Sequence, residues 1–211
     1  PYVIHLETTN ICNFKCRFCP ESNEDYEEIT EGWKIMKYEM FEYIINNIKN
    51  SFGKVNVIRL WIMGEPLLNR EIFKMIKYAK ETSVADKIEL TTNGSLLTQK
   101  NRIDLVKSGL DLCKISIYGK TKEEMKQTSQ TNVTPEHILS CIKELDLLRK
   151  QENSDMKVMA KTIANKEGIP FYEVDSNSGK NTFSYKATIE ELNHAIIQAD
   201  TDTSVQCILL T

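Results

Sequence analysis

Expected strands and helices alternate along the first 163 residues, and this alternation strongly limits the folds that the chain can adopt. Stretches rich in β-branched and aromatic residues predict strands, and apolar residues at helical spacing predict helices. The strands are expected at 2–9, 54–63, 87–92, 112–118 and 156–163, and the helices at 36–50, 69–81, 98–109 and 135–151. Such alternation, at a spacing of roughly 30 residues, is typical of βαβ units, which build a parallel sheet with right-handed crossovers. The expected fold class is therefore α/β.

The pattern weakens after residue 163. A sixth strand is expected near 168–176, a helix at 188–199 and a last strand at 204–210. We therefore predict a core domain over 1–163, with 164–211 forming either the end of the same domain or a C-terminal extension.

Composition narrows the classes of function. A net charge of -3 and a pI near 5.8 give no general electrostatic reason to bind nucleic acid. No apolar run approaches the about 20 residues that span a bilayer, and the first residues do not form a signal peptide. A cytoplasmic, reducing compartment is expected. The chain begins at Pro1 rather than Met, so it is expected to be a segment of a longer protein.

Three cysteines follow the first expected strand closely, in the stretch TTNICNFKCRFCPES. Cys12, Cys16 and Cys19 have the spacing Cys-x3-Cys-x2-Cys, which lets one loop hold three thiolates around one inorganic centre. A disulfide would leave one thiol over. Structural zinc takes four ligands, usually as two pairs, and the spacing does not favour His5 as the fourth. An iron–sulfur cubane normally takes four cysteines, so three would leave one iron open.

The segment CNFKCRFC resembles the CX3CXΦC signature of the radical S-adenosylmethionine (radical SAM) superfamily, with Phe18 as the aromatic Φ. The following βα units resemble that family's partial (β/α)6 barrel, over about residues 2–163. The resemblance implies a [4Fe–4S] cluster on the three cysteines, with S-adenosylmethionine (SAM) bound at the open iron. It also implies an electron donor such as flavodoxin or ferredoxin, reductive cleavage of SAM, and hydrogen-atom abstraction from a substrate.

A second motif, MGEPLL, follows the second expected strand and resembles the family's GGEP motif, which binds the amino group of SAM. The resemblance implies that Glu65 supplies the acceptor, that Gly64 allows close backbone approach and that Pro66 fixes the turn. Met63 stands where the family usually has the first glycine. Taken alone, Gly-Glu-Pro also suits an ordinary turn at the end of a strand.

Four more residues are candidates for contacts with SAM by resemblance. Asn93 would bond SAM or order the cysteine loop, and Ser116 would contact the ribose or the carboxylate of SAM. Lys161 would pair with the carboxylate as a point charge, and Phe18 would lie against the adenine. Each has a structural alternative: an Asn-Gly turn, an outward-facing strand residue, a solvated lysine and a packed core aromatic, respectively.

The remaining cysteines and two charged stretches have simpler interpretations. Cys113, Cys141 and Cys207 lie among apolar residues and are expected to be small buried hydrophobes. The stretches 21–28 and 123–128 are rich in charge and are expected to be solvated segments, the first of them a candidate flap over the cavity. The cysteine loop and the residues that follow GEP look like those of SPASM and twitch members. No further cysteine group is present in this sequence, so auxiliary clusters are not expected within it.

Two hypotheses from different classes follow. The first is a radical SAM enzyme that acts on a peptide or a small molecule. The second is a non-catalytic metal-binding module that holds zinc or a degenerate cluster, and the missing fourth ligand weighs against it. RNA modification, known among relatives, is disfavoured by the acidic balance and by the lack of a basic aromatic face.

Overall fold

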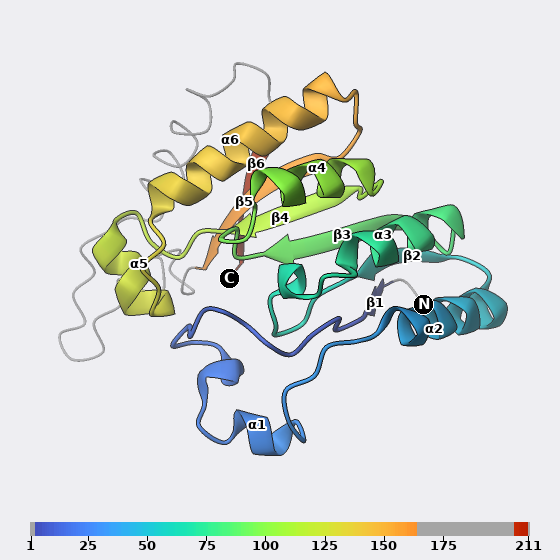
Figure 1. Cartoon of the computed structure of the whole chain (residues 1–211), viewed down its shortest axis with the longest axis horizontal. Coiled ribbons are helices and arrows are strands. Elements are labelled where there is room, and N and C mark those ends of the chain that lie inside the picture. The colour runs from blue at the N-terminus through green and yellow to red at the C-terminus, as the bar shows by residue number, and fades with distance from the viewer. Residues whose placement is uncertain (1–2, 164–204, 211) are drawn as a thin grey trace.

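The computed structural model describes residues 3–163 and 205–210. All strands are parallel and form one open sheet in chain order (Figure 1). They are β1 (Val3–His5), β2 (Val55–Arg59), β3 (Ala85–Thr92), β4 (Leu112–Ser116), β5 (Lys157–Ile163) and β6 (Val205–Leu210). The predicted α/β class is confirmed, and each strand expected in the described part of the chain is present. The strand expected at 168–176 and the helix expected at 188–199 lie outside the described residues.

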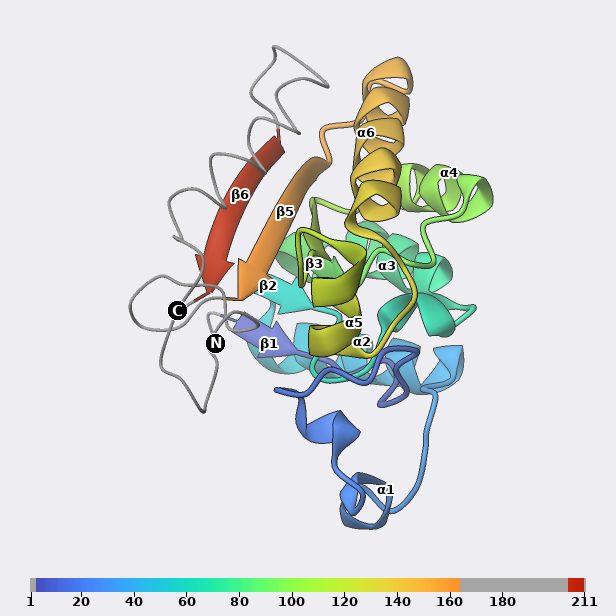
Figure 2. The ribbon, with the colours of Figure 1, turned by 90° about the vertical axis from the view of Figure 1, so that its left-hand side faces the viewer.

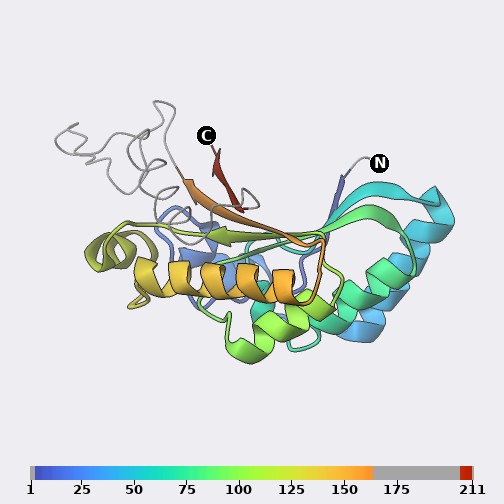
Figure 3. The same ribbon diagram turned by 90° about the horizontal axis from the view of Figure 1, so that it is seen from above.

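Four longer helices cover one face of this curved sheet (Figures 2 and 3). They are α2 (Tyr38–Phe52), α3 (Ile72–Glu81), α4 (Gln99–Lys107) and α6 (Pro135–Gln151), and they match the expected helices to within a few residues. Two shorter helices, α1 (Tyr26–Ile29) and α5 (Lys122–Ser129), complete the described part. None of the described helices has the length and apolar character that crossing a membrane requires.

The hydrophobic core lies between the sheet and the helices. Alternation along β2, β3 and β4 directs fully buried side chains such as Ile58, Ile88 and Ile115 toward the helical layer. Burying each such side chain contributes about 1.5–3 kcal/mol. The residues of opposite parity, among them Arg59 and Lys114, lie on the uncovered face. The fold therefore leaves polar side chains of the strands facing the interior of an open barrel.

The expectation of a solvated segment at 123–128 is wrong in part, because this stretch lies within α5 and is partly buried, although its charged residues Glu123 and Lys126 are exposed. Thr121 accepts a hydrogen bond from the Glu124 amide, and the Glu124 carboxylate caps in return, which closes a capping box. Met125 is fully buried, and Thr128 and Ser129 are buried beside it. Most residues of α5 are charged or polar, and its buried side is too short to be predicted from hydrophobic periodicity alone.

The expectation for 21–28 is also wrong in part. Glu21 is only 2% exposed and Tyr26 is buried, so this stretch is folded back onto the protein. Lys15 forms an ion pair with Glu21 at 2.8 Å, which explains how a carboxylate is tolerated there. The ring of Tyr26 packs against that of Trp33, with 5.7 Å between centroids. The stretch is thus a packed continuation of the cysteine loop.

Candidate functional site

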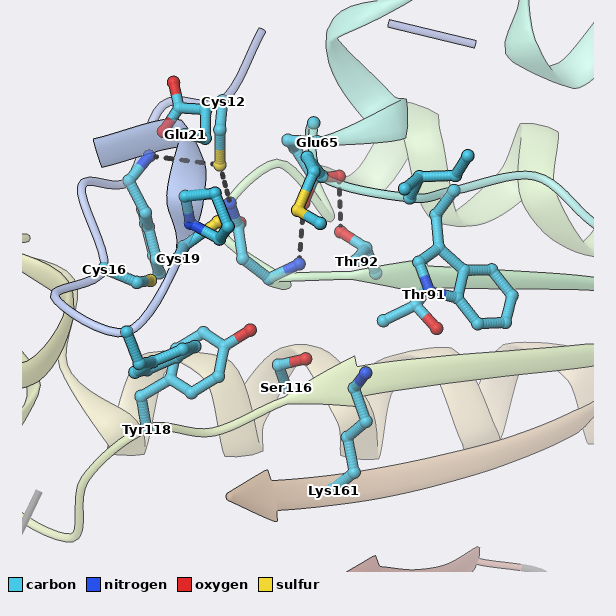
Figure 4. Close-up of a pocket in the computed structure, with 18 residues that line it drawn as sticks. Cys12, Cys16, Cys19, Glu21, Glu65, Thr91, Thr92, Ser116, Tyr118 and Lys161 are labelled. Atoms are coloured by element: carbon cyan, nitrogen blue, oxygen red, sulfur yellow. Dashed lines mark hydrogen bonds between the residues drawn. The ribbon is translucent and has the colours of Figure 1, made fainter. Parts of the chain in front are cut away.

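A cavity of about 300 Å³ lies where β2, β3, β4 and β5 end (Figure 4). Parallel α/β folds place their ligand sites at this edge, because all the carboxyl ends of the strands meet there. Nine of the ten candidate residues line the cavity: Cys12, Cys16, Phe18, Cys19, Gly64, Glu65, Asn93, Ser116 and Lys161. The tenth, Pro66, does not line the cavity and is buried at the start of the 3₁₀ turn Pro66–Leu68.

The cysteine loop is anchored on its far side by the end of α5. The amide of Lys15 donates to the carbonyl of Ser129 at 3.1 Å, and that of Arg17 donates to the carbonyl of Thr128 at 2.9 Å. The last carbonyls of a helix have no partner within the helix, so the loop supplies the donors that they need. The unpredicted α5 therefore positions the segment between Cys12 and Cys19.

The entrance to the loop is anchored by a second set of bonds. Asn10 donates through Nδ2 to the carbonyl of Gly32 at 3.0 Å, and its Oδ1 accepts from the amide of Lys34 at 2.6 Å. The hydroxyl of Thr9 donates to the Lys34 carbonyl at 3.0 Å. These contacts join the start of the loop to the segment that leads into α2, so the loop is fixed at both ends.

The three thiols lie in a desolvated setting. Burial raises the pKa of the Cys12 thiol to about 11, although the amide of Phe14 donates to its sulfur at 3.4 Å and opposes the shift. Burial likewise raises the pKa of Cys16 and that of Cys19. Thiols of this kind keep their protons at neutral pH unless a metal centre compensates the thiolate charge. A bound metal centre would have to supply that compensation.

The sulfurs share the cavity without converging on one point. Among the described residues, no three His, Cys, Asp or Glu side chains form a site for a single metal ion. In a four-iron cluster each cysteine binds a different iron, so its thiolates stand apart at separate corners. The donor set of three cysteines around one cavity is compatible with such a cluster.

Gly64 brings the end of β2 against the cysteine loop. A Cβ at this position would lie 2.9 Å from the carbonyl oxygen of Ile11 and closer still to that of Thr9. The next residue, Glu65, donates its amide to the same Ile11 carbonyl at 2.8 Å. Only glycine permits this backbone contact, so the GEP turn and the cysteine loop are fitted to each other.

The carboxylate of Glu65 is 2% exposed and accepts three hydrogen bonds. Its Oε1 accepts from the Leu67 amide at 3.0 Å and from the Thr92 hydroxyl at 2.7 Å, and its Oε2 accepts from the Asn93 amide at 2.7 Å. Burial raises the pKa of this carboxyl, and the three donors oppose that shift. Each carboxylate oxygen can accept about two bonds, so Oε2 retains capacity for one more donor.

Asn93 contacts the cysteine loop directly. Its Nδ2 donates to Oδ1 of Asn13 at 2.8 Å and lies 3.9 Å from Sγ of Cys12, while its Oδ1 accepts from the amide of Ser95 at 3.0 Å. Of the two roles expected for Asn93, these contacts favour ordering the loop.

The opposite wall of the cavity comes from β4 and β5. Figure 4 shows Ser116, Tyr118 and Lys161 there, facing the cysteines. The Phe18 ring packs against that of Tyr118, with 5.2 Å between centroids. Burial, together with the charge of Lys114, lowers the pKa of the Lys161 ammonium to about 8.

Several residues that line the cavity are not predicted from the sequence motifs. Trp61 and Thr91 line the cavity beside the predicted residues, and Glu21 does so next to Cys19. Thr91 is on β3, and Asn93 follows that strand two positions later. Alternation along an extended chain places both side chains on the same side of the sheet, so this spacing could have identified Thr91. Cys113 and Cys141 are buried free thiols away from the cavity, as expected, whereas the side chain of Cys207 lies outside the described residues.

Comparison with known proteins identifies the family. The model of the radical SAM superfamily matches residues 6–148. GTP 3′,8-cyclase of Clostridium acetobutylicum is 31% identical over 131 residues, which are 62% of this chain and 37% of the cyclase. An S-adenosylmethionine-dependent nucleotide dehydratase of Selenomonas ruminantium is 33% identical over 97 residues, 46% of this chain and 31% of the dehydratase. The chain thus spans about a third of the length of these two relatives.

Solved structures of low sequence identity share the fold. Streptococcus suis SuiB bound to S-adenosylmethionine superposes over 100% of this chain and 51% of SuiB, with a TM-score of 0.62 and 16% identity. The enzyme anSMEcpe with bound AdoMet superposes over 100% of this chain and 52% of its own, with a TM-score of 0.60 and 18% identity. The expected partial barrel of the radical SAM type is confirmed by these likenesses. Because the family model matches residues 6–148, which are more than half of this chain, the chain belongs to the radical SAM superfamily.

Proposed function

We propose that this chain is the core of an enzyme that cleaves SAM reductively and abstracts a hydrogen atom from a substrate. In this proposal Cys12, Cys16 and Cys19 hold a [4Fe–4S] cluster, and SAM occupies the cavity beside it. One observation carries the proposal: three thiols from one loop line the same cavity as the GEP turn, and no fourth cysteine or histidine in the described ranges lines it. When bound, the cluster supplies the electron that splits the sulfonium and generates a 5′-deoxyadenosyl radical.

The residues around the cavity then bind and orient SAM. The free acceptor capacity of Glu65 suits the amino group of SAM, while Gly64 and Pro66 hold the turn in place. In the same proposal the charged form of Lys161 pairs with the carboxylate of SAM, and Ser116, which lines the same cavity, contacts the ribose or the carboxylate. Two features support these roles: Ser116 Oγ is buried on the cavity wall, and Lys161 forms no ion pair with a carboxylate in the part of the chain that the structure describes, where Lys114 is the charge that acts on it.

Phe18 is proposed to lie against the adenine of SAM. Its ring and that of Tyr118 form an apolar wall on the cavity, between the second and third cysteines and the end of β4. A planar aromatic surface offers the adenine a stacking partner.

The proposed partners are an electron donor such as flavodoxin or ferredoxin and a substrate that is a peptide or a small molecule. Similar proteins represent both kinds of substrate: a GTP cyclase and a nucleotide dehydratase among the relatives, and SuiB, whose structure was solved bound to its precursor peptide. A cytoplasmic setting is proposed because a reducing compartment preserves thiols such as Cys113 and Cys141.

The test uses anaerobically reconstituted protein with a low-potential reductant and SAM. The protein should show the optical and spin-resonance spectra of a [4Fe–4S] cluster that change when SAM is added, and it should release 5′-deoxyadenosine. The Cys16→Ala variant, treated identically, should release none. A colourless protein that retains zinc, or a cluster whose spectra ignore SAM, would favour the non-catalytic metal module.

A further inference from the structure

A group of charged side chains lies on the open face of the sheet, at the end of the cavity away from the cysteines. Glu89 on β3 accepts from Nε of Arg59 on β2 at 3.1 Å and from Nζ of Lys114 on β4 at 2.8 Å. We call Arg59, Glu89 and Lys114 the charged triad. Its members come from neighbouring strands, and the register pairs Arg59 with Glu89 directly.

The triad has two cations and one carboxylate, so its positive charge exceeds its negative charge. Although burial alone would raise the pKa of Glu89, its bonds to Lys114 and Arg59 lower it, so this carboxylate is ionised at neutral pH. The side chains of Lys114 and Glu89 are 16% and 9% exposed, whereas that of Arg59 is 32% exposed. An excess charge in such a partly desolvated place favours an anion that compensates it. The triad therefore creates a site that favours a negatively charged group.

The triad is continuous with the cavity. The ring of Trp61, which lines the cavity, lies near both cations: its centroid is 5.7 Å from Cζ of Arg59 and 5.3 Å from Nζ of Lys114. Thr91 also lines the cavity and pairs in register with Lys114. Figure 4 shows Thr91 on the side of the cavity opposite the cysteines. A ligand that enters beside Trp61 would therefore reach the triad.

One hydroxyl at this end has no partner. Thr91 Oγ1 is buried and makes no hydrogen bond to any described residue. A buried hydroxyl without a partner is destabilising, so its presence on a cavity wall points to a ligand that bonds it. Its O–H could donate a hydrogen bond to the same anion that the two cations of the triad attract.

We propose that Lys114 and Arg59, with the hydroxyl of Thr91, bind an anionic group of the substrate, a carboxylate or a phosphate. This inference rests on the proposed function, in which Lys161 pairs with SAM and the cysteines hold the cluster, so the triad is left for the substrate. Glu89 fixes both cations in place, and Trp61 offers a planar apolar surface to the part of the substrate next to its anionic group. The substrate would thus bind with its charge away from the cluster.

The experiment measures anion binding through the fluorescence of Trp61 in the reconstituted protein. The chain has two tryptophans, so Trp33→Phe leaves Trp61 as the only one. Inorganic pyrophosphate and succinate serve as the phosphate and carboxylate probes. At least one of them should change the emission in a saturable way. Lys114→Gln should weaken that binding by tenfold or more.

Lys87→Gln is the matched control, because it removes the same charge from an exposed position on β3. It should leave binding within twofold of that of the Trp33→Phe protein. Saturation by pyrophosphate alone identifies a phosphate site, and saturation by succinate alone identifies a carboxylate site. Saturation by neither probe, or equal losses in Lys114→Gln and Lys87→Gln, would overturn the inference.

The same samples separate this inference from the proposed function. The response of the cluster's spin-resonance spectrum to SAM reports the proposed function and does not depend on the probes. A SAM response without anion binding rejects the anion site alone. Anion binding without any SAM response rejects the proposed function and keeps the anion site.

Discussion

The amide nitrogen of Glu65 lies 2.8 Å from the carbonyl oxygen of Ile11 and donates a hydrogen bond to it. This bond joins the turn after β2 to the residue just before the first cysteine. It forms because the glycine preceding Glu65 has no side chain to hold the two backbones apart. The spacing of the two motifs in the sequence thus becomes a direct contact, and the geometry of the cysteine loop depends on the GEP turn.

We expect Gly64→Ala to lose most of its bound iron. The added methyl group would overlap the Thr9 carbonyl, so the loop must move away from the turn. Iron per chain after anaerobic reconstitution is the measurement. Gly53→Ala is the control, because Gly53 has open space around it and a positive φ of 68°. It should lower stability by about 1–2 kcal/mol without loss of iron; equal loss of iron in both variants would contradict the fitted contact.

The cysteines should divide into two classes. Replacing any of Cys12, Cys16 or Cys19 by Ala should abolish the cluster, because each thiolate anchors a different iron. Cys113→Ala removes a fully buried thiol from the core and should cost about 1 kcal/mol of stability with the cluster intact. Visible absorption and iron content distinguish the classes. Loss of the cluster in Cys113→Ala to the same degree would show that the cysteines have been sorted wrongly.

SAM affinity should fall as the pH rises past about 8. Lys161 has its pKa lowered to about 8, so it is charged below that pH and neutral above it. Only the charged form pairs with the carboxylate of SAM, so the Kd should increase by up to about tenfold for each pH unit in this range. The measurement is the titration of the cluster's spin-resonance signal with SAM at several pH values.

Lys161→Arg is the control for this pH dependence. Arginine keeps its charge at every pH used, while any titration of SAM itself is the same for both proteins. The Kd of the variant should therefore change less with pH than that of the wild type. Identical slopes would show that Lys161 does not pair with the carboxylate.

Much of the site could be predicted from the sequence, because the carboxyl ends of parallel strands meet at one edge. Cys12, Glu65 and Asn93 each follow a different strand, so their meeting at one cavity follows from the fold class. Pro66 follows the same strand as Glu65, yet its ring is buried within the turn. A residue's position after a strand predicts that it lies near the cavity, and the conformation of the local turn determines whether its side chain lines the cavity.

The charged triad could not be predicted in the same way. Arg59, Glu89 and Lys114 are separated by 30 and 25 residues, and their contact depends on the register between three strands. A shift of one residue in either pairing would move the side chains to opposite faces. From the sequence alone, a charged residue in a strand that forms a buried ion pair cannot be distinguished from one that is solvated, because the pairing depends on the register.

The role of α5 in holding the cysteine loop leads to a last prediction. Thr121→Ala removes the N-cap of α5 and should cost about 1 kcal/mol of stability. Since α5 supplies the carbonyls of Thr128 and Ser129 to the loop, its fraying should also speed the loss of iron to a chelator. Thr98→Ala, which removes the N-cap of α4, should cost a similar stability without faster loss of iron, because the backbone bonds that hold the cysteine loop come from α5. If both variants lose iron equally fast, the loop depends on overall stability and not on α5.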